Sequence, residues 1–218
     1  MKKNQLKLVL AAVGAAGSLL SAQANVVTGS IWENDSDPAT PANVPLTAPN
    51  VTFTANSPLN FSSYSGGGTS GADNTFYTIA SWLNTGGGVI TSGAANGGDT
   101  MDNTLFNFTG TVSVTSGEQF TITHDDGVTL VIGGDTVVSA PGATAPVQTT
   151  DTYTGPTGNE SFQLVYSEVD GPGAVLQVDL PFVGSPVPEP STFVAGALLL
   201  LPLGLQSIRS WKNRKQAA

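Results

Sequence analysis

The sequence predicts an all-β protein, an antiparallel β-sandwich flanked by an N-terminal signal helix and a C-terminal single transmembrane helix. Short segments of alternating apolar and polar residues recur between clusters of turn-forming residues, which is typical of a sandwich. Gly, Ser, Thr, Asn and Pro are abundant between the two ends, whereas Lys, Arg and Glu, which commonly fill helix surfaces, are scarce there. An apolar stretch beside basic residues marks each end of the chain.

Residues 1–24 have the three parts of a secretory signal peptide, followed by the body at residues 25–186. These parts are a cationic start, an apolar core and the small residues of a cleavage site: Lys2, Lys3 and Lys7, then Leu8–Leu20, then Ala22 and Ala24. The mature chain is therefore expected to begin at Asn25.

Seven segments of the body have the period-two pattern of strands. In chain order they are Val51–Ala55, Val112–Thr115, Phe120–Thr123, Val128–Ile132, Thr136–Ser139, Phe162–Tyr166 and Val175–Leu180. Alternate side chains of a strand point to opposite faces, so the apolar set of each strand is expected to face one core. In the second half these sets are Phe120 and Ile122; Val128, Leu130 and Ile132; Phe162, Leu164 and Tyr166; and Leu176, Val178 and Leu180.

Other local signals concern the segments between these strands. The pair Gly133 and Gly134 supplies the positive φ angles of a two-residue hairpin turn. A short helix is expected over Ile79–Leu83. Segments 62–75 and 84–103 are rich in glycine and are expected to be irregular, because ordering glycine costs much backbone entropy.

The C-terminal residues predict a membrane span. The uncharged stretch 191–208 precedes the basic residues Arg209, Lys212, Arg214 and Lys215. About 18 residues at about 1.5 Å each nearly cross the hydrocarbon core of a bilayer, and the basic cluster is expected to stay in the cytoplasm.

The four residues Val187, Pro188, Glu189 and Pro190 stand directly before this span. Together with the apolar helix and the basic end, they resemble the PEP-CTERM sorting signal (ice-binding-protein C-terminal-type tail) of Gram-negative bacteria that make extracellular polysaccharide. The resemblance covers residues 187–218. It implies that an exosortase-type membrane enzyme cuts near the Pro-Glu-Pro, and that the body passes from the inner membrane to the cell surface or the extracellular matrix. A plain single-pass anchor is the alternative, although such anchors need no Pro-Glu-Pro.

The charge distribution excludes several classes of partner. All seven Lys and Arg residues lie in the two ends, at positions 2, 3, 7, 209, 212, 214 and 215. Glu189 is one of the 16 acidic residues, so the net charge of −9 conceals a body of about −15. A body without cationic side chains cannot neutralise phosphates, which excludes nucleic acid and anionic lipid surfaces. Ca²⁺ or Mg²⁺ would supply the missing positive charge; alternatively, the acids only keep the protein soluble.

The second half of the body resembles the protective-antigen-type (PA-fourteen) domain, a β-sandwich of toxins, glycosidase accessory modules and flocculins. The matching residues are Asp125-Asp126-Gly127, Leu130-Val131-Ile132, Gly133-Gly134, Val137-Val138 and the stretch from Tyr166 to Leu180. In sugar-binding members a cis peptide joins the two aspartates, and both carboxylates bind one Ca²⁺ that also holds sugar hydroxyls. The resemblance thus implies that Asp125 and Asp126 are calcium ligands.

The rest of the calcium shell is expected from the loop "SEVDGPG", through Glu168, Asp170 or backbone carbonyls, with Asp170 taken as the third candidate. The asparagine usual in the family is not evident there. The alternative is that Asp-Asp-Gly is a turn whose side chains accept backbone N–H bonds and bind nothing.

The sequence does not favour an enzyme, and no catalytic residue is assigned. His124 has no cysteine partner, the chain has no Gly-x-Ser-x-Gly motif, and a lone histidine beside acids is more often a pH-responsive surface group. The predicted function is that of an exported surface or matrix protein that binds glycans with calcium. A ligand-free matrix component of the same fold is the alternative, and a glycoside hydrolase is a third.

The sorting hypothesis predicts a defined product. Mass spectrometry of culture medium is expected to find a chain that begins at Asn25 and lacks the peptide containing Trp211. A full-length, membrane-bound form as the sole product would contradict processing.

Overall fold

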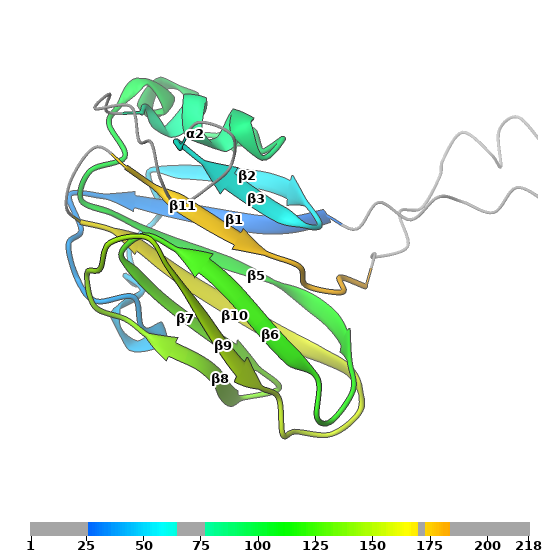
Figure 1. The fold of residues 1–218 in the computed structure, drawn as a ribbon. Helices are drawn as coiled ribbons and strands as arrows, with labels where there is room; N and C mark the ends of the chain where they lie inside the picture. Colours follow the sequence, from blue (N-terminus) through cyan, green and yellow to red (C-terminus); the bar gives the residue numbers. More distant parts are fainter. Residues whose placement is uncertain (1–25, 65–76, 170–172, 184–218) are drawn as a thin grey trace, which may run out of the picture. The chain divides into compact units, whose positions relative to one another are not determined.

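A computed structural model describes residues 26–64, 77–169 and 173–183. The described chain forms two antiparallel sheets packed face to face (Figure 1), which confirms the predicted β-sandwich. One sheet has seven strands, in the order β4 (Val89–Ser92), β2 (Val51–Asn56), β1 (Val26–Glu33), β5 (Thr104–Val114), β10 (Gly158–Glu168), β7 (Gly127–Ile132) and β8 (Asp135–Ala140). The other has four strands, in the order β3 (Leu59–Ser62), β11 (Val175–Val178), β6 (Gln119–His124) and β9 (Val147–Thr152).

The long pairing of β5 with β10 forms the centre of the larger sheet. It runs in register from Val114 opposite Gly158 to Thr104 opposite Glu168. The predicted strand at Val112–Thr115 is therefore the end of a longer strand that starts at Thr104. The β7–β8 hairpin turns at Gly133 and Gly134, whose φ angles of 60° and 91° confirm the predicted glycine turn.

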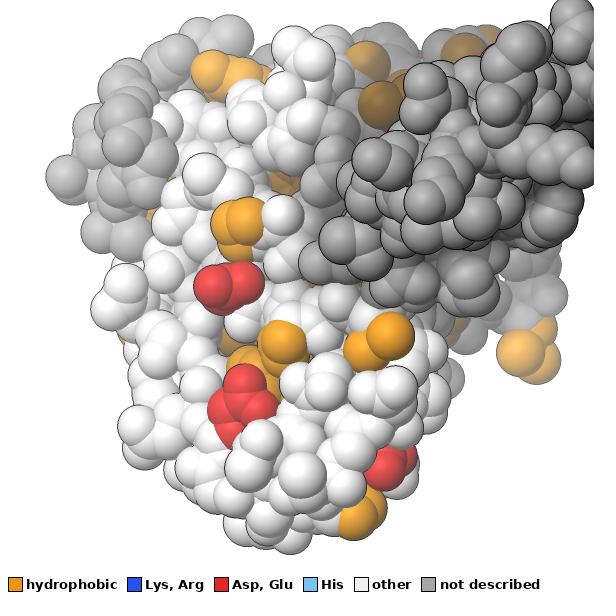
Figure 2. All heavy atoms as spheres, turned by 90° about the vertical axis from the view of Figure 1, so that its right-hand side faces the viewer, with side chains coloured by type: hydrophobic (Ala, Val, Ile, Leu, Met, Phe, Trp, Pro, Cys, Tyr) orange, Lys and Arg blue, Asp and Glu red, His pale blue; other side chains and the backbone are white. Residues whose placement is uncertain are grey.

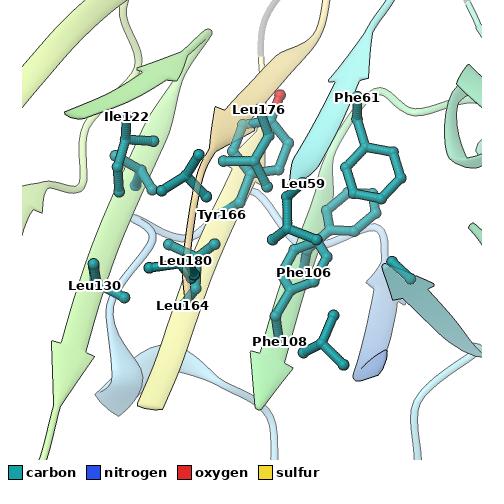
Figure 3. Packing of buried hydrophobic residues seen from close by; sticks show 14 of the residues in the cluster. Leu59, Phe61, Phe106, Phe108, Ile122, Leu130, Leu164, Tyr166, Leu176 and Leu180 are labelled. Atoms are coloured by element: carbon teal, nitrogen blue, oxygen red, sulfur yellow. The ribbon is translucent and has the colours of Figure 1, made fainter. Parts of the chain in front are cut away.

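The core lies between the sheets and is filled by the side chains predicted to point inward. The apolar sets of β6, β7, β10 and β11 are all buried. Figure 3 shows Ile122, Leu176 and Leu59 of the smaller sheet facing Leu130 and Leu164 of the larger one. Burial of these alternating apolar residues fixes the register of both sheets, because a slip by one residue would turn each set toward water.

The helix α2 (Ile79–Thr85) joins the two layers through its tryptophan. Thr78 caps its N-terminus in a capping box with Ser81, which satisfies backbone N–H groups that lack helical partners. The Trp82 ring stacks on Phe61 of the smaller sheet at 4.7 Å and on Tyr166 of the larger sheet at 5.7 Å. The expected helix at Ile79–Leu83 is confirmed, and it closes one part of the core.

Several elements were not predicted from the sequence. The strands β1, β3 and β9 lie in segments without an assigned structure, and segment 84–103, expected to be irregular, contains β4 and the 3-10 helix η4 (Ala94–Gly98). A second 3-10 helix, η2, spans Pro41–Asn43. The part of segment 62–75 beyond residue 64 lies outside the described residues.

The aromatic cluster predicts where the fold is most sensitive to mutation. Phe106 is fully buried, and its ring centroid lies 5.1 Å from that of Trp82 and 5.5 Å from that of Tyr166. Phe106→Ala is expected to lower the free energy of unfolding by about 3–5 kcal/mol, measured by urea denaturation. Leu46→Ala is the control, since Leu46 is 106% exposed and its truncation is expected to change stability by less than about 0.5 kcal/mol. Similar small losses in both variants would contradict this packing.

Candidate functional site

Asp125 and Asp126 form a corner at which the chain passes from one sheet to the other. Strand β6 ends at His124 in the smaller sheet, and β7 begins at Gly127 in the larger one. Backbone hydrogen bonds hold the corner, because Asp125 N donates to Val175 O at 3.0 Å and Asp126 N donates to Thr144 O at 2.9 Å. Asp-Asp-Gly is therefore a crossing between layers, and the hairpin itself lies further on, between β7 and β8.

The backbone of this corner differs from what the family resemblance implies. Among the described residues the cis peptide bond is Ser57–Pro58, so the bond between Asp125 and Asp126 is trans. Asp126 instead has a φ of 61°, in the left-handed region that Asp and Asn tolerate better than most residues. The bond therefore differs from the cis bond of sugar-binding members of the family, and the chain makes its sharp change of direction at Asp126.

Each aspartate accepts hydrogen bonds from a different part of the protein. The Tyr64 hydroxyl donates to Asp125 Oδ2 at 2.5 Å. The two oxygens of Asp126 accept backbone N–H bonds, from Thr144 at 3.1 Å and from Val169 at 2.7 Å. A Cβ at Gly173 would lie 2.2 Å from the Tyr64 hydroxyl oxygen, so glycine at this position allows Tyr64 to reach Asp125.

A third carboxyl group, that of Glu168, is buried beside the two aspartates. Asp125, Asp126 and Glu168 are 6%, 3% and 1% exposed. The Tyr166 hydroxyl donates to Glu168 Oε2 at 2.9 Å, while Glu168 Oε1 is buried without a hydrogen-bond partner in the described structure. An unpartnered buried carboxyl oxygen is costly, because water would otherwise solvate it.

Burial and mutual repulsion shift the pKa values of these acids upward. Burial raises the pKa of Glu168 to about 10, and the negative charges of Asp126 and Asp125 contribute to the rise. Burial also raises the pKa of Asp125 to about 6, where the charge of Asp126 adds to the rise and the Tyr64 hydrogen bond opposes it. The carboxyl groups of Asp125, Asp126 and Glu168 thus lie close enough for electrostatic interaction. All Lys and Arg side chains of the protein fall outside the described residues.

His124 is a structural residue of the corner, which corrects the expectation of a surface group. Its side chain is fully buried, and Nδ1 lies 2.7 Å from Asp126 O. A carbonyl oxygen can only accept, so Nδ1 carries the proton, and Nε2 of the neutral ring accepts from the Thr149 hydroxyl at 2.8 Å. Burial lowers the pKa of His124, which keeps the ring neutral near pH 7.

The structure brings together two of the three predicted metal ligands, Asp125 and Asp126. Asp170, the signal-peptide residues Ala22 and Ala24, the sorting motif 187–190 and the expected span 191–208 all lie outside the described residues. No helix in the described part is long and apolar enough to cross a membrane. Within that part, no three His, Cys, Asp or Glu side chains already converge in the arrangement of a metal site.

Glu168 is the site residue that the sequence reasoning named only as an alternative to Asp170. The signal that identifies it is the alternation of β10, in which Phe162, Leu164 and Tyr166 point inward. Glu168 is the next inward position of the same period. It follows that a carboxyl group was to be expected at the edge of the core.

Comparison with known proteins supports the fold. No family model matches the sequence, and no curated protein matches it. Among solved structures, a PA14 sugar-binding domain from an RTX adhesin is 18% identical, with a TM-score of 0.51 over 73% of this chain and 91% of that one. The fold is similar to that of PA14 domains. The PA14 domain of the MpAFP antifreeze protein is 17% identical, with a TM-score of 0.51 over 74% of this chain and 84% of that one. The predicted protective-antigen-type fold of the body is thereby confirmed.

The buried acids predict an unusual dependence of stability on pH. Glu168 has an ordinary pKa of 4.5 in the unfolded chain and of about 10 in the folded one. Below about pH 4.5 Glu168 is protonated in both the folded and the unfolded state. As the pH rises towards 10, the unfolded chain loses this proton more readily than the folded one, so the free energy of unfolding falls. At about 1.4 kcal/mol per pH unit, the loss by pH 7 is about 3 kcal/mol.

In Glu168→Gln the side chain cannot ionise. This variant is therefore expected to be more stable than the parent at pH 7 in EDTA, by up to about 3 kcal/mol. Its stability is also expected to fall less between pH 6 and 8, as measured by urea denaturation. Asp135→Asn, at an exposed position, is the control and is expected to keep the parental slope. Equal slopes for Glu168→Gln and the parent would show that Glu168 is not held protonated.

Proposed function

We propose that the chain is an exported, non-enzymatic surface or matrix protein that binds glycans at the Asp125–Asp126 corner with the help of Ca²⁺. The observation that carries the proposal is the burial of three interacting carboxyl groups, those of Asp125, Asp126 and Glu168, with no cationic side chain among the described residues. Charges that are removed from water are normally paired or bound to a metal ion. A divalent cation is the missing charge that exported proteins obtain from their surroundings.

The donor chemistry of the corner suits calcium. Ca²⁺ takes six to eight oxygen ligands, and carboxylates are the strongest of them. Asp125, Asp126 and the unpartnered Oε1 of Glu168 would hold the ion once their side chains turn toward one point, because they do not converge on one in the described structure. Asp170 remains proposed as a further ligand. A bound Ca²⁺ would supply a positive charge to which the hydroxyl groups of a sugar can coordinate.

Three hydrogen bonds to the aspartates set the conditions for binding. The Tyr64 hydroxyl donates to Asp125 Oδ2, so an ion at that oxygen would share it with the phenol. Both oxygens of Asp126 accept backbone N–H bonds, so an ion at Asp126 would share these oxygens with the two donors. The backbone thus holds the Asp126 carboxylate in place.

The similarity to PA14 domains supports the same proposal from a separate direction. One of the similar structures is described as a sugar-binding domain of an adhesin. The proposed location, the cell surface or the extracellular matrix, agrees with such a role, and sorting through an exosortase would bring the body there. The histidine of the corner is buried and held by two hydrogen bonds, so it is poorly placed for acid–base catalysis.

A second function, that of a ligand-free structural component, is favoured by the trans bond and by the inward hydrogen bonds of Asp125 and Asp126. In this case the corner only joins the two sheets. The two functions differ in their response to calcium.

The calcium proposal predicts a thermal shift. The melting temperature of the purified protein is expected to rise in millimolar Ca²⁺, because a ligand at a hundredfold excess over its Kd stabilises the folded state by about 2.7 kcal/mol. The Asp125→Asn/Asp126→Asn variant is expected to lose the shift. Glu168→Gln is expected to fold stably yet bind calcium more weakly, which separates ligand loss from unfolding.

The control is Asp135→Asn, which removes an exposed acid from the β7–β8 hairpin and is expected to keep the full shift. A melting temperature that ignores calcium, or that shifts equally in the double variant, would rule out the specific site in favour of the structural role. A glycan array in Ca²⁺ and in EDTA then distinguishes a calcium-dependent adhesin from a matrix component.

A further inference from the structure

The outer face of the smaller sheet carries a groove that is separate from the aspartate corner. This sheet forms the front layer in Figure 1, where β3, β11, β6 and β9 lie side by side. The groove has a volume of about 470 Å³. Its polar lining comes from all four strands and the residue after β11: Asn60, Thr121, Thr123, Gln148, Gln177 and Asp179.

The register of the sheet places these side chains in line. Gln177 pairs with Asn60 on one side and with Thr123 on the other, and Thr123 pairs with Gln148. Residues directly opposite each other in antiparallel strands point to the same face. One row of four amide and hydroxyl side chains therefore crosses the whole sheet, and Thr121 opposite Thr150 begins the next row.

Hydrogen bonds within the row orient the amide groups. Gln177 Nε2 donates to Asn60 Oδ1 at 2.7 Å, and Gln148 Nε2 donates to Thr123 Oγ1 at 3.3 Å. Asn60 Nδ2 and Gln148 Oε1 make no hydrogen bond within the described structure, and both residues are exposed. The groove thus presents a donor on one flank and an acceptor on the other, with the exposed Asp179 carboxylate as a further acceptor.

We propose that this groove binds a neutral polysaccharide chain without calcium. A sugar hydroxyl both donates and accepts hydrogen bonds, so it can satisfy the Asn60 amide nitrogen and the Gln148 carbonyl oxygen alike. The groove is shallow and open along the sheet, which suits an extended polymer that lies across the surface.

Charge selects this occupant over other polymers. The body carries about fifteen negative charges, and all basic residues lie in the terminal segments, so anionic polymers are repelled. A cationic partner would bind where acidic side chains are dense. The row itself is uncharged, and Asp179 is the one ionisable side chain in the described lining of the groove, so the groove does not favour a cationic polymer. The face shown in Figure 2 carries scattered acidic and hydrophobic side chains and no basic side chain among its described residues.

The groove is separate from the proposed calcium site. The two hydrogen bonds given above, from Gln177 to Asn60 and from Gln148 to Thr123, do not involve Asp125, Asp126 or Glu168. Thr123 lies on β6, and Asp125 follows the end of this strand, two residues or about 7 Å further along the chain, so the groove adjoins the corner. Two adjoining contacts on one polymer chain would increase retention in a matrix.

The test is affinity electrophoresis of the purified protein in native gels that contain EDTA and a soluble neutral polysaccharide. The probes are a mixed-linkage β-glucan, a galactomannan and a dextran, with alginate as the anionic contrast. At least one neutral probe is expected to retard the protein, and the Asp135→Asn variant, changed at an exposed position of the β7–β8 hairpin, is expected to be retarded equally. Asn60→Ala/Gln148→Ala, which removes the donor and the acceptor, is expected to bind about tenfold more weakly.

The matched control is Asn107→Ala/Gln163→Ala, which removes the same two residue types from the larger sheet, where Gln163 Nε2 donates to Asn107 Oδ1 at 2.9 Å. It is expected to bind like the parent, and thermal melting checks that both double variants fold. Retardation by none of the neutral probes, by alginate alone or only in the presence of calcium would overturn the proposal. Retardation only in the presence of calcium would overturn the groove proposal but would support the calcium site.

The groove proposal would also be overturned by an equal loss of binding in the control variant. Sedimentation velocity tests the remaining occupant, a second copy of the chain. If the protein self-associates and Asn60→Ala/Gln148→Ala abolishes this, the face is a dimer interface instead.

Discussion

The structure depends on the corner at which the chain leaves the smaller sheet and enters the larger one. Asp126 accepts backbone N–H bonds from Thr144 and Val169, which belong to two loops distant in sequence. The buried imidazole of His124 binds the carbonyl of the same residue. These contacts tie β6, β7 and the end of β10 together, so the position of one carboxylate sets the geometry of the whole site. The same burial that holds the corner also makes its charges costly, because water no longer solvates them.

That cost is the link between structure and the proposed function. Three carboxyl groups are buried together in a part of the chain that holds no Lys or Arg. One solution is a proton, which the raised pKa of Glu168 reflects, and another is a divalent cation. Proteins accept such local destabilisation mainly at functional sites. By contrast, the row of amide and hydroxyl side chains in the groove on the outer face of the smaller sheet is uncharged, and it is held by neutral hydrogen bonds.

Much of the second half of the fold could be predicted because its strands obey one rule. The strands β6, β7, β10 and β11 alternate apolar and polar residues, since one face meets the core. Strand β9 was missed because it lies at a sheet edge and its residues are mostly exposed, so no apolar alternation remains. Strand β4, also at an edge, is four residues long with Val89 61% exposed. Edge strands are held by backbone pairing, which leaves little trace in the side chains.

The sequence by itself determined the layered β fold, the inward faces of the later strands, the glycine turn of the β7–β8 hairpin and the acidic, cation-poor body. These follow from local periodicity and from composition, which need no knowledge of the partner strands. Only the tertiary structure decided that Asp125 and Asp126 join two sheets through a trans bond, that Glu168 lies buried beside them and that His124 is inside. It also aligned Asn60, Gln177, Thr123 and Gln148 in one row. Such arrangements depend on which strands become neighbours, and long-range pairing of this kind is not encoded in any short stretch of residues.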